Sequence, residues 1–228
     1  MLIPLLLTAS LLASPAPQEI EEKLSTLQLV LLRKGPKPDP TGSQASQMQA
    51  AHLANLANLH RKRVNLAYGP LESDDIAGIA ILDVPSADAA KKAFAADPFV
   101  QAGVMTVEVH PVKASKEWFH AAATTELDRP AAKDLEPLVF GLFMKGPSEG
   151  NREATERLHE QYMEGLRGLR KVVAEGPIAG DPNLREYVIY RPADPDEAQT
   201  LGASDPAVKS GELTLRTHRW MTFKGIFR

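Results

Sequence analysis

The segment DPFVQAG, residues 97–103, recurs as DPAVKSG at residues 205–211. Other distinctive residues keep their order around both segments. In each place a His precedes a Gly-Pro pair by 17 residues, and a second His follows the Asp by 13 residues. The two series are His52, Gly69-Pro70, Asp97 and His110, and His159, Gly176-Pro177, Asp205 and His218. We interpret this register as two related domains in tandem within 228 residues.

The periodicity of each repeat predicts the order strand, helix, strand, strand, helix, strand. Residues 27–33 form a continuous apolar run that is typical of a buried strand, and residues 43–63 form a helix with few breakers. Further strands are expected at residues 64–68, 76–84 and 104–112, and a second helix at residues 85–96. Asp97 should end that helix, because a proline disfavours helical backbone in the residue before it.

This order is the split βαβ, or ferredoxin-like, pattern, in which helices cover one face of an antiparallel sheet. The other face also needs a cover. We therefore predict an α+β fold in which the two domains pack sheet to sheet as an α+β barrel within one chain. The expected segments are a signal peptide at 1–16, a linker at 17–25, domain 1 at 26–113, a linker at 114–136 and domain 2 at 137–228.

The first His of each repeat lies on the inward stripe of its helix. The stripe of the first helix is Met48, His52, Leu56 and Leu59, and that of the second is Thr155, His159, Met163 and Leu166. The second His of each repeat falls on a strand, on the face opposite to Met105, Val107 and Val109. His110 and His218 should then point toward the partner sheet, where a hydrogen bond between the domains is the interpretation we favour over a cavity-lining role.

Composition excludes several classes of function. The chain has no Cys, which rules out disulfides, thiol catalysis and thiolate metal sites. A net charge of −3 argues against a nucleic-acid-binding surface. The chain also lacks the phosphate-binding, dinucleotide-binding, zinc-protease and serine-hydrolase motifs, so we expect neither a metal nor a cofactor.

The N-terminal stretch MLIPLLLTASLLASPA, residues 1–16, has the apolar core and small residues of a secretory signal peptide, and it is too short to span a membrane. It lacks a basic start, and Pro17 would follow the cut. We expect a secreted or periplasmic protein without a stable membrane anchor after cleavage; the alternative is a cytoplasmic protein with an apolar tail.

The chain resembles the YCII-related domain family. The resemblance rests on the helical His in AHLANL (51–56), the turn GPL (69–71), the strand GIAIL (78–82) and the block ADPFVQAG (96–103). It covers residues 26–113 and, more weakly, 137–223, where Ala207 replaces Phe99 and Ser210 replaces Ala102. It implies a dimeric α+β barrel with a cleft lined by the helical His and the Asp. Some members resemble enzymes that eliminate HCl from products of chlorinated aromatic breakdown, and others resemble domains used with transcription regulators.

The candidate catalytic residues are His52 with Asp97 and His159 with Asp205. A neutral imidazole is the natural general base near pH 7, and a carboxylate on its other nitrogen would fix the tautomer. The equally weighted alternative is a structural pair that holds the helix to its sheet. Gly69-Pro70 and Gly176-Pro177 are interpreted as turns that let the backbone come close, with a secondary ligand-binding role shared by His110 and His218.

Three hypotheses follow. The protein is a cofactor-free lyase or isomerase that acts on a small organic substrate, a small-ligand-binding module of the cell envelope, or a protein in which the His–Asp pairs are structural. The tandem is expected to act as a monomer, with its two domains paired as in a dimer, or as a homodimer.

Overall fold

The computed structural model describes residues 23–149, 152–192 and 194–227, so the expected signal peptide lies outside the described residues. The first half of the chain holds β1 (Leu24–Lys34), α1 (Gly42–Arg61), β2 (Asn65–Pro70), β3 (Ile76–Leu82), α2 (Ala87–Phe94), α3 (Pro98–Gln101) and β4 (Met105–Ser115). The second half holds β5 (Leu135–Lys145), α4 (Arg152–Gly168), β6 (Val172–Pro177), β7 (Leu184–Tyr190), α5 (Pro195–Ser204), α6 (Pro206–Lys209) and β8 (Leu213–Phe223).

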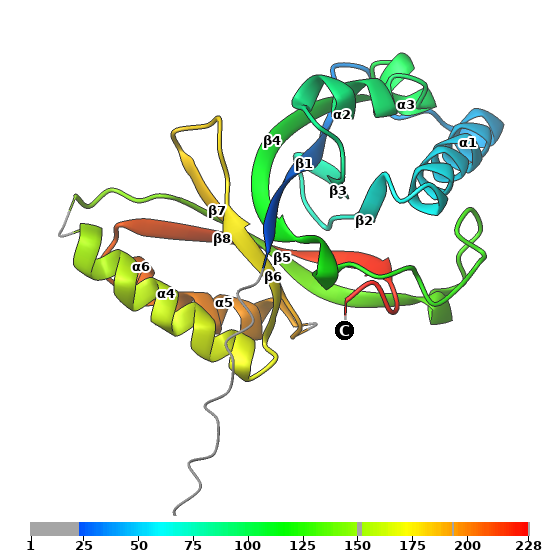
Figure 1. Ribbon diagram of the computed structural model, residues 1–228. Coiled ribbons are helices and arrows are strands. Elements are labelled where there is room, and N and C mark those ends of the chain that lie inside the picture. The colour runs from blue at the N-terminus through cyan, green and yellow to red at the C-terminus, as the bar shows by residue number, and fades with distance from the viewer. Residues whose placement is uncertain (1–22, 150–151, 193, 228) are drawn as a thin grey trace, which may run out of the picture.

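Each half forms a four-stranded antiparallel sheet with the same strand order, β2-β3-β1-β4 and β6-β7-β5-β8. Helices α1, α2 and α3 cover the outer side of one sheet, and α4, α5 and α6 cover the outer side of the other, at the opposite end of the molecule (Figure 1). The predicted α+β fold of two βαββαβ units is confirmed. The short helices α3 and α6 were not predicted; each begins directly after the Asp of its Asp-Pro pair, which is the N-cap residue.

The two sheets meet along two seams that close a barrel. At one seam β2 approaches β8, with a bridge between Leu71 and Trp220, and at the other β4 approaches β6, with a bridge between Val112 and Ile178. Backbone hydrogen bonds from Glu72 to Arg219 (2.9 Å) and from Ala179 to Pro111 (2.8 Å) reinforce the seams. The sheets therefore pack against each other within one chain, as the sequence predicted.

The alternation of β5 shows how the core is divided. Leu138, Phe140 and Leu142 belong to an apolar cluster that includes residues of both halves, so they face the barrel interior. Val139 and Phe143 belong to a second cluster with the helical residues Met163 and Leu166, so they face the helices. Burial of both faces by different partners explains why this strand reads as a continuous apolar run rather than an alternating one.

The central linker is shorter than the sequence indicated. Strand β4 continues to Ser115, and β5 already begins at Leu135. The extra residues stay in the sheet because β1 is itself longer and pairs with β4 from Leu24 opposite Ser115 to Lys34 opposite Met105. Among the described residues, no helix has both the length and the apolar character needed to cross a bilayer.

Candidate functional site

His52 and Asp97 form a buried pair between α1 and the start of α3. The distance from His52 Nδ1 to Asp97 Oδ2 is 2.6 Å. Asp97 is completely buried and also accepts hydrogen bonds from the Phe99 amide (3.1 Å) and from Asn55 Nδ2 (3.5 Å). A group that accepts from several donors is a carboxylate, so Nδ1 of His52 carries its hydrogen. Among the described residues, none hydrogen-bonds Nε2 of His52, which is therefore available to accept a proton.

His159 and Asp205 repeat this pair in the second half. The distance from His159 Nδ1 to Asp205 Oδ2 is also 2.6 Å, and Asp205 accepts from the Ala207 amide at 2.8 Å. Here Nε2 is also engaged, because it lies 3.2 Å from Glu186 Oε2. Both ring nitrogens of His159 donate to carboxylates, so the ring is an imidazolium.

The electrostatics agree with this assignment. Burial lowers the pKa of His159, but hydrogen bonds to Asp205 and Glu186, together with the negative charges of these carboxylates, outweigh the burial and raise the pKa to about 10. An imidazolium whose pKa lies far above 7 holds its proton at neutral pH and cannot act there as a general base. The two histidines, which the sequence placed in equivalent positions, therefore differ in their partners: two carboxylates hold His159, and one holds His52.

The difference arises from one position on the third strand of each sheet. Gly78 pairs with Leu32 in the first half, and Glu186 pairs with Phe143 in the second. Leu32 and Phe143 are equivalent, since each lies two residues before the end of its strand. The position that supplies a carboxylate to His159 thus supplies no side chain to His52.

In both halves a phenylalanine ring contacts the helical histidine, but the ring comes from a different element. The ring of Phe99 meets His52 edge to face, with 5.4 Å between ring centroids. His159 has the same kind of contact at 5.2 Å, but with Phe143 of β5. The position of Phe99 holds Ala207 in the second half, and the position of Phe143 holds Leu32 in the first.

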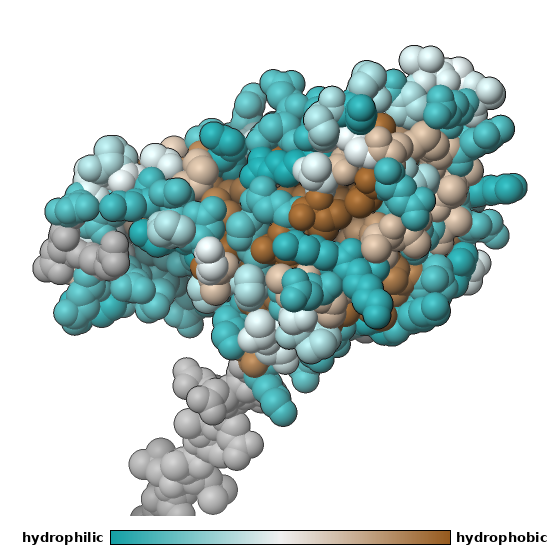
Figure 2. All heavy atoms as spheres, turned by 90° about the horizontal axis from the view of Figure 1, so that it is seen from above, coloured by the Kyte–Doolittle hydropathy of each residue, from teal (hydrophilic) through white to brown (hydrophobic). Residues whose placement is uncertain are grey.

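A cavity of about 460 Å³ lies beside His159. Its walls combine small residues with charges of both signs: Lys145, Ser148, Glu149, Thr155, Glu156, His159, Arg185, Glu186, Ala207, Glu212 and Leu213. Ala207 in the place of a phenylalanine leaves this side of the imidazolium open. Figure 2 shows that, on the face it presents, hydrophilic side chains dominate over the second half, at the left, and apolar ones gather toward the first.

The Gly-Pro pairs lie at the seams and not beside the histidines. They end strands β2 and β6 and form no turn, which corrects the sequence interpretation. The predicted close approach is real: a Cβ atom on Gly69 would lie 1.7 Å from the Met221 carbonyl oxygen, and one on Gly176 would lie 2.1 Å from that of Lys113. These glycines let the two halves meet, and their prolines, Pro70 and Pro177, occupy edge positions that suit a residue without an N–H.

The strand histidines do not behave alike. His218 Nδ1 lies 3.3 Å from the Glu72 carbonyl oxygen, which is a hydrogen bond between the halves. His110 makes no such bond; its Nε2 lies 2.6 Å from Glu108 of the same strand. Arg33 is the physical reason, because its guanidinium donates to both carboxylate oxygens of Glu108, at 2.7 and 3.3 Å, and so holds Oε1 within reach of His110. Neither histidine lines the cavity at His159.

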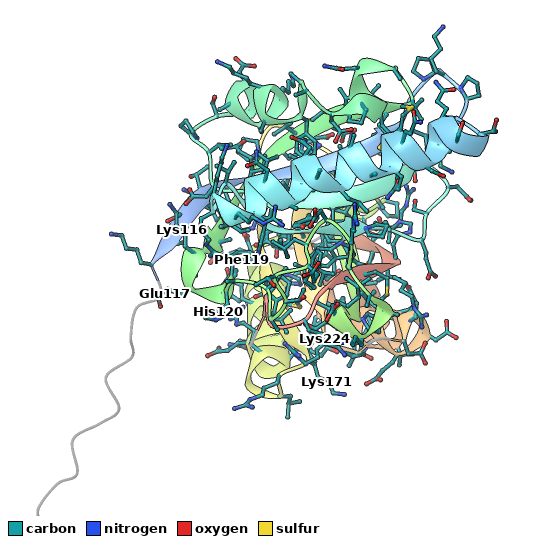
Figure 3. The ribbon with its side chains drawn as sticks, turned by 90° about the vertical axis from the view of Figure 1, so that its right-hand side faces the viewer. Lys116, Glu117, Phe119, His120, Lys171 and Lys224 are labelled. Carbon is teal, nitrogen blue, oxygen red and sulfur yellow. The ribbon has the colours of Figure 1, made fainter. Side chains whose placement is uncertain are left out.

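Sequence reasoning missed two polar residues, the half-buried Glu186 and the buried His60. Glu186 gave no signal, because the equivalent residue is a glycine. His60 is buried near the end of α1, where Nδ1 donates to the Asn65 carbonyl oxygen (2.8 Å) and Nε2 accepts from the Ala122 amide (3.3 Å). Figure 3 shows Phe119 and His120 of the segment after β4 beside this end of α1. These hydrogen bonds connect the segment to the first half. The equivalent position in the second half holds Arg167.

Solved structures with a similar fold cover nearly the whole chain. A candidate chlorite dismutase, TA0507, aligns with a TM-score of 0.53 and 12% identity, over 87% of this chain and 94% of its own. A heme-binding protein from Thermus thermophilus aligns with a TM-score of 0.53 and 11% identity, over 88% and 94%. A candidate monooxygenase from Fusobacterium nucleatum aligns with a TM-score of 0.50 and 8% identity, over 87% and 93%. At such low identity these likenesses show the α+β barrel fold alone.

The sequence comparisons concern the first half of the chain. No curated protein sequence matches significantly. The model of the YCII-related domain matches residues 19–113, which include α1 with His52 and the Asp97-Pro98 pair. Over these residues the first half of the chain is similar to a YCII-related domain.

Proposed function

We propose that the protein is an enzyme in which His52 acts as a general base on a small organic substrate. The observation that carries this proposal is the state of the ring: Asp97 fixes the hydrogen on Nδ1 at 2.6 Å, and no described residue hydrogen-bonds Nε2. An oriented imidazole with one open ring nitrogen can take a proton from a substrate and return it later in the same reaction.

The chain supplies the parts of such a proton transfer. Nε2 removes a proton from a carbon or oxygen of the substrate, and the ring becomes an imidazolium. Asp97, which is buried and accepts from Nδ1, stabilises that charge without moving. Isomerisation follows if the proton returns to another atom, and elimination follows if a leaving group departs. Resemblance to family members that eliminate HCl makes chlorinated, ring-derived organic acids the first substrates to test.

A second candidate function is ligand binding without chemistry in the second half. The cavity at His159 offers the two cations Lys145 and Arg185 and four glutamates. Glu186 and Asp205 hold the imidazolium in its charged form, so it serves as a fixed positive charge. This arrangement favours a small polar ligand and does not provide a base.

Heme binding, which the structural neighbour from Thermus thermophilus performs, does not fit the residues around His159. An imidazole ligates iron through a nitrogen lone pair, and both nitrogens of His159 are occupied by carboxylates. Most of the residues around the adjacent cavity are charged, which suits neither face of an apolar porphyrin. We therefore derive no step through a heme.

Deuterium exchange tests the proposed base without any need to identify the product. The protein is incubated in D₂O with a panel of small organic acids and lactones, chlorinated ones included, and loss of substrate C–H signals is followed by proton NMR. Wild type should exchange at least one compound, and His52→Gln should slow that exchange by about 10²–10⁴-fold. His159→Gln is the matched control and should keep the rate. Exchange that persists unchanged in His52→Gln would refute the assignment.

A further inference from the structure

A second cavity lies at the C-terminal end of α4 and carries a different charge. It has a volume of about 580 Å³ and is lined by Trp118, Arg167, Arg170, Val172, Val173, Ala174 and Arg191. It shares no lining residue with the cavity at His159. Its walls combine three guanidinium groups with an indole and short aliphatic side chains, although the chain as a whole has a net charge of −3.

Two of the three arginines lie in the last turn of α4 and directly after it, and the third follows β7. They are not all neutralised. Arg167, in the last turn of α4, forms an ion pair with Glu175. Arg191, which follows β7, donates from its guanidinium to the Phe227 carbonyl oxygen at 3.5 Å. Within the described part of the chain, no carboxylate compensates its charge. The side chain of Arg170 has no hydrogen bond or ion pair among the described residues. Two positive charges therefore remain available in the cavity.

Arg170 has a counterpart in the first half that shows what its position can do. Arg63 and Arg170 follow their helices with the same left-handed backbone, φ 57° in both. This conformation is unusual for a residue with a side chain and costs on the order of 1 kcal/mol. Arg63 donates to the Phe119 carbonyl oxygen at 2.8 Å, so in the first half the side chain is aimed at an acceptor. In the second half the cavity lies in front of Arg170.

We propose that this cavity binds an organic anion that joins a carboxylate to an apolar, planar or short aliphatic body. The guanidinium groups of Arg170 and Arg191 match the geometry of a carboxylate, which accepts paired hydrogen bonds from such donors. The indole of Trp118 and the side chains of Val172 and Val173 form the surface that the apolar body contacts. The proposal does not depend on the reaction at His52.

Benzoate is the first probe, and acetate and inorganic phosphate are the comparison anions. Trp118 lines the cavity while Trp220 is completely buried, so a change in tryptophan fluorescence reports on Trp118. Benzoate should cause a saturable change, confirmed by calorimetry. Acetate, which lacks the apolar body, and phosphate, which cannot use the apolar wall, should bind at least about tenfold more weakly.

Arg170→Asn is the decisive variant, because asparagine tolerates the left-handed backbone while the substitution removes the guanidinium. Benzoate affinity should fall at least about tenfold in Arg170→Asn and in Arg191→Gln. Arg157→Asn, which removes an exposed charge from the same helix, is the control and should bind as wild type does. Equal affinity in wild type and Arg170→Asn, or no saturable benzoate binding, would overturn the site. Equal affinity for benzoate, acetate and phosphate would overturn the apolar part of the proposal.

Discussion

Phe99 and Phe143 place an aromatic edge against the two helical histidines from different elements, α3 in the first half and β5 in the second. Each contact is absent from the other half, where Ala207 and Leu32 occupy the corresponding positions. Each histidine thus contacts one phenylalanine ring, which belongs to a helix in the first half and to the sheet in the second. It leaves space beside His159, and the cavity of about 460 Å³ occupies that space.

Exchange of these side chains should therefore have unequal effects on stability. Phe99 is 6% exposed, so Phe99→Ala should lower the free energy of unfolding by about 3 kcal/mol through lost burial and a new cavity. Ala207→Phe places its ring in existing space and should cost less than about 1 kcal/mol. Urea denaturation of both variants checks this expectation. A large loss in Ala207→Phe would show that the cavity cannot accept the ring.

The seam glycines should not tolerate a methyl group. Gly69→Ala and Gly176→Ala bring a Cβ atom within 2.2 Å of a backbone oxygen of the other half, so each seam must open. We expect a loss of about 3 kcal/mol or more in the free energy of unfolding for each variant. Gly165→Ala in α4 is the matched control, because no atom lies within 4 Å of its Cβ position. It should stabilise the protein by about 0.5–1 kcal/mol.

Stability should fall as the solution becomes alkaline, because of His159. Its pKa is raised from 6.5 to about 10 in the folded protein, so between these values the folded state keeps a proton that the unfolded chain releases. The contribution is complete below about pH 6.5 and is lost as the pH rises toward 10, by at most about 1.4 kcal/mol per pH unit. Urea denaturation from pH 6 to 9 measures the slope. His159→Gln should flatten it, and the same slope in both proteins would contradict the assignment.

The buried aspartates should be essential to stability whatever the function of their histidines. Asp205→Ala removes the partner of His159 and the acceptor for the Ala207 amide, leaving buried donors unpaired. The expected cost is about 2–4 kcal/mol, with a similar cost for Asp97→Ala. Asp74→Ala, at an exposed position, should change the free energy of unfolding by less than about 0.5 kcal/mol. Asp205→Asn, which keeps the amide acceptor, should lose less than Asp205→Ala.

Features that recur in both halves were the ones the sequence could predict. The spacing of His52, Asp97 and their counterparts indicated two similar units, and the inward helix stripe placed each histidine against its sheet. The structure brings each His and Asp together, although the short helix that begins after each Asp was not predicted. The packing of one sheet on the other also followed from elementary burial, since an apolar strand with two covered faces needs a second sheet.

Features that differ between the halves gave no such signal. Glu186 replaces a glycine, so comparison of the two halves could not mark it as a partner for His159. Gly69 was interpreted as a turn residue because Gly-Pro is typical of turns, whereas the constraint on it is the backbone of the other half at Met221. His110 was expected to form a hydrogen bond with the other half. It lies instead against Glu108 of its own strand, which Arg33 holds in place. Each error came from a contact that the local sequence pattern does not encode.

The two seams have a consequence for how such a molecule can change. In an assembly of two identical chains every substitution is made twice, so both sites must accept it together. In a barrel formed by a single polypeptide, the two halves can be substituted independently. A residue such as Glu186 can therefore be present in one half and not in the other. An imidazole with one open nitrogen and an imidazolium with both nitrogens engaged therefore coexist in one barrel.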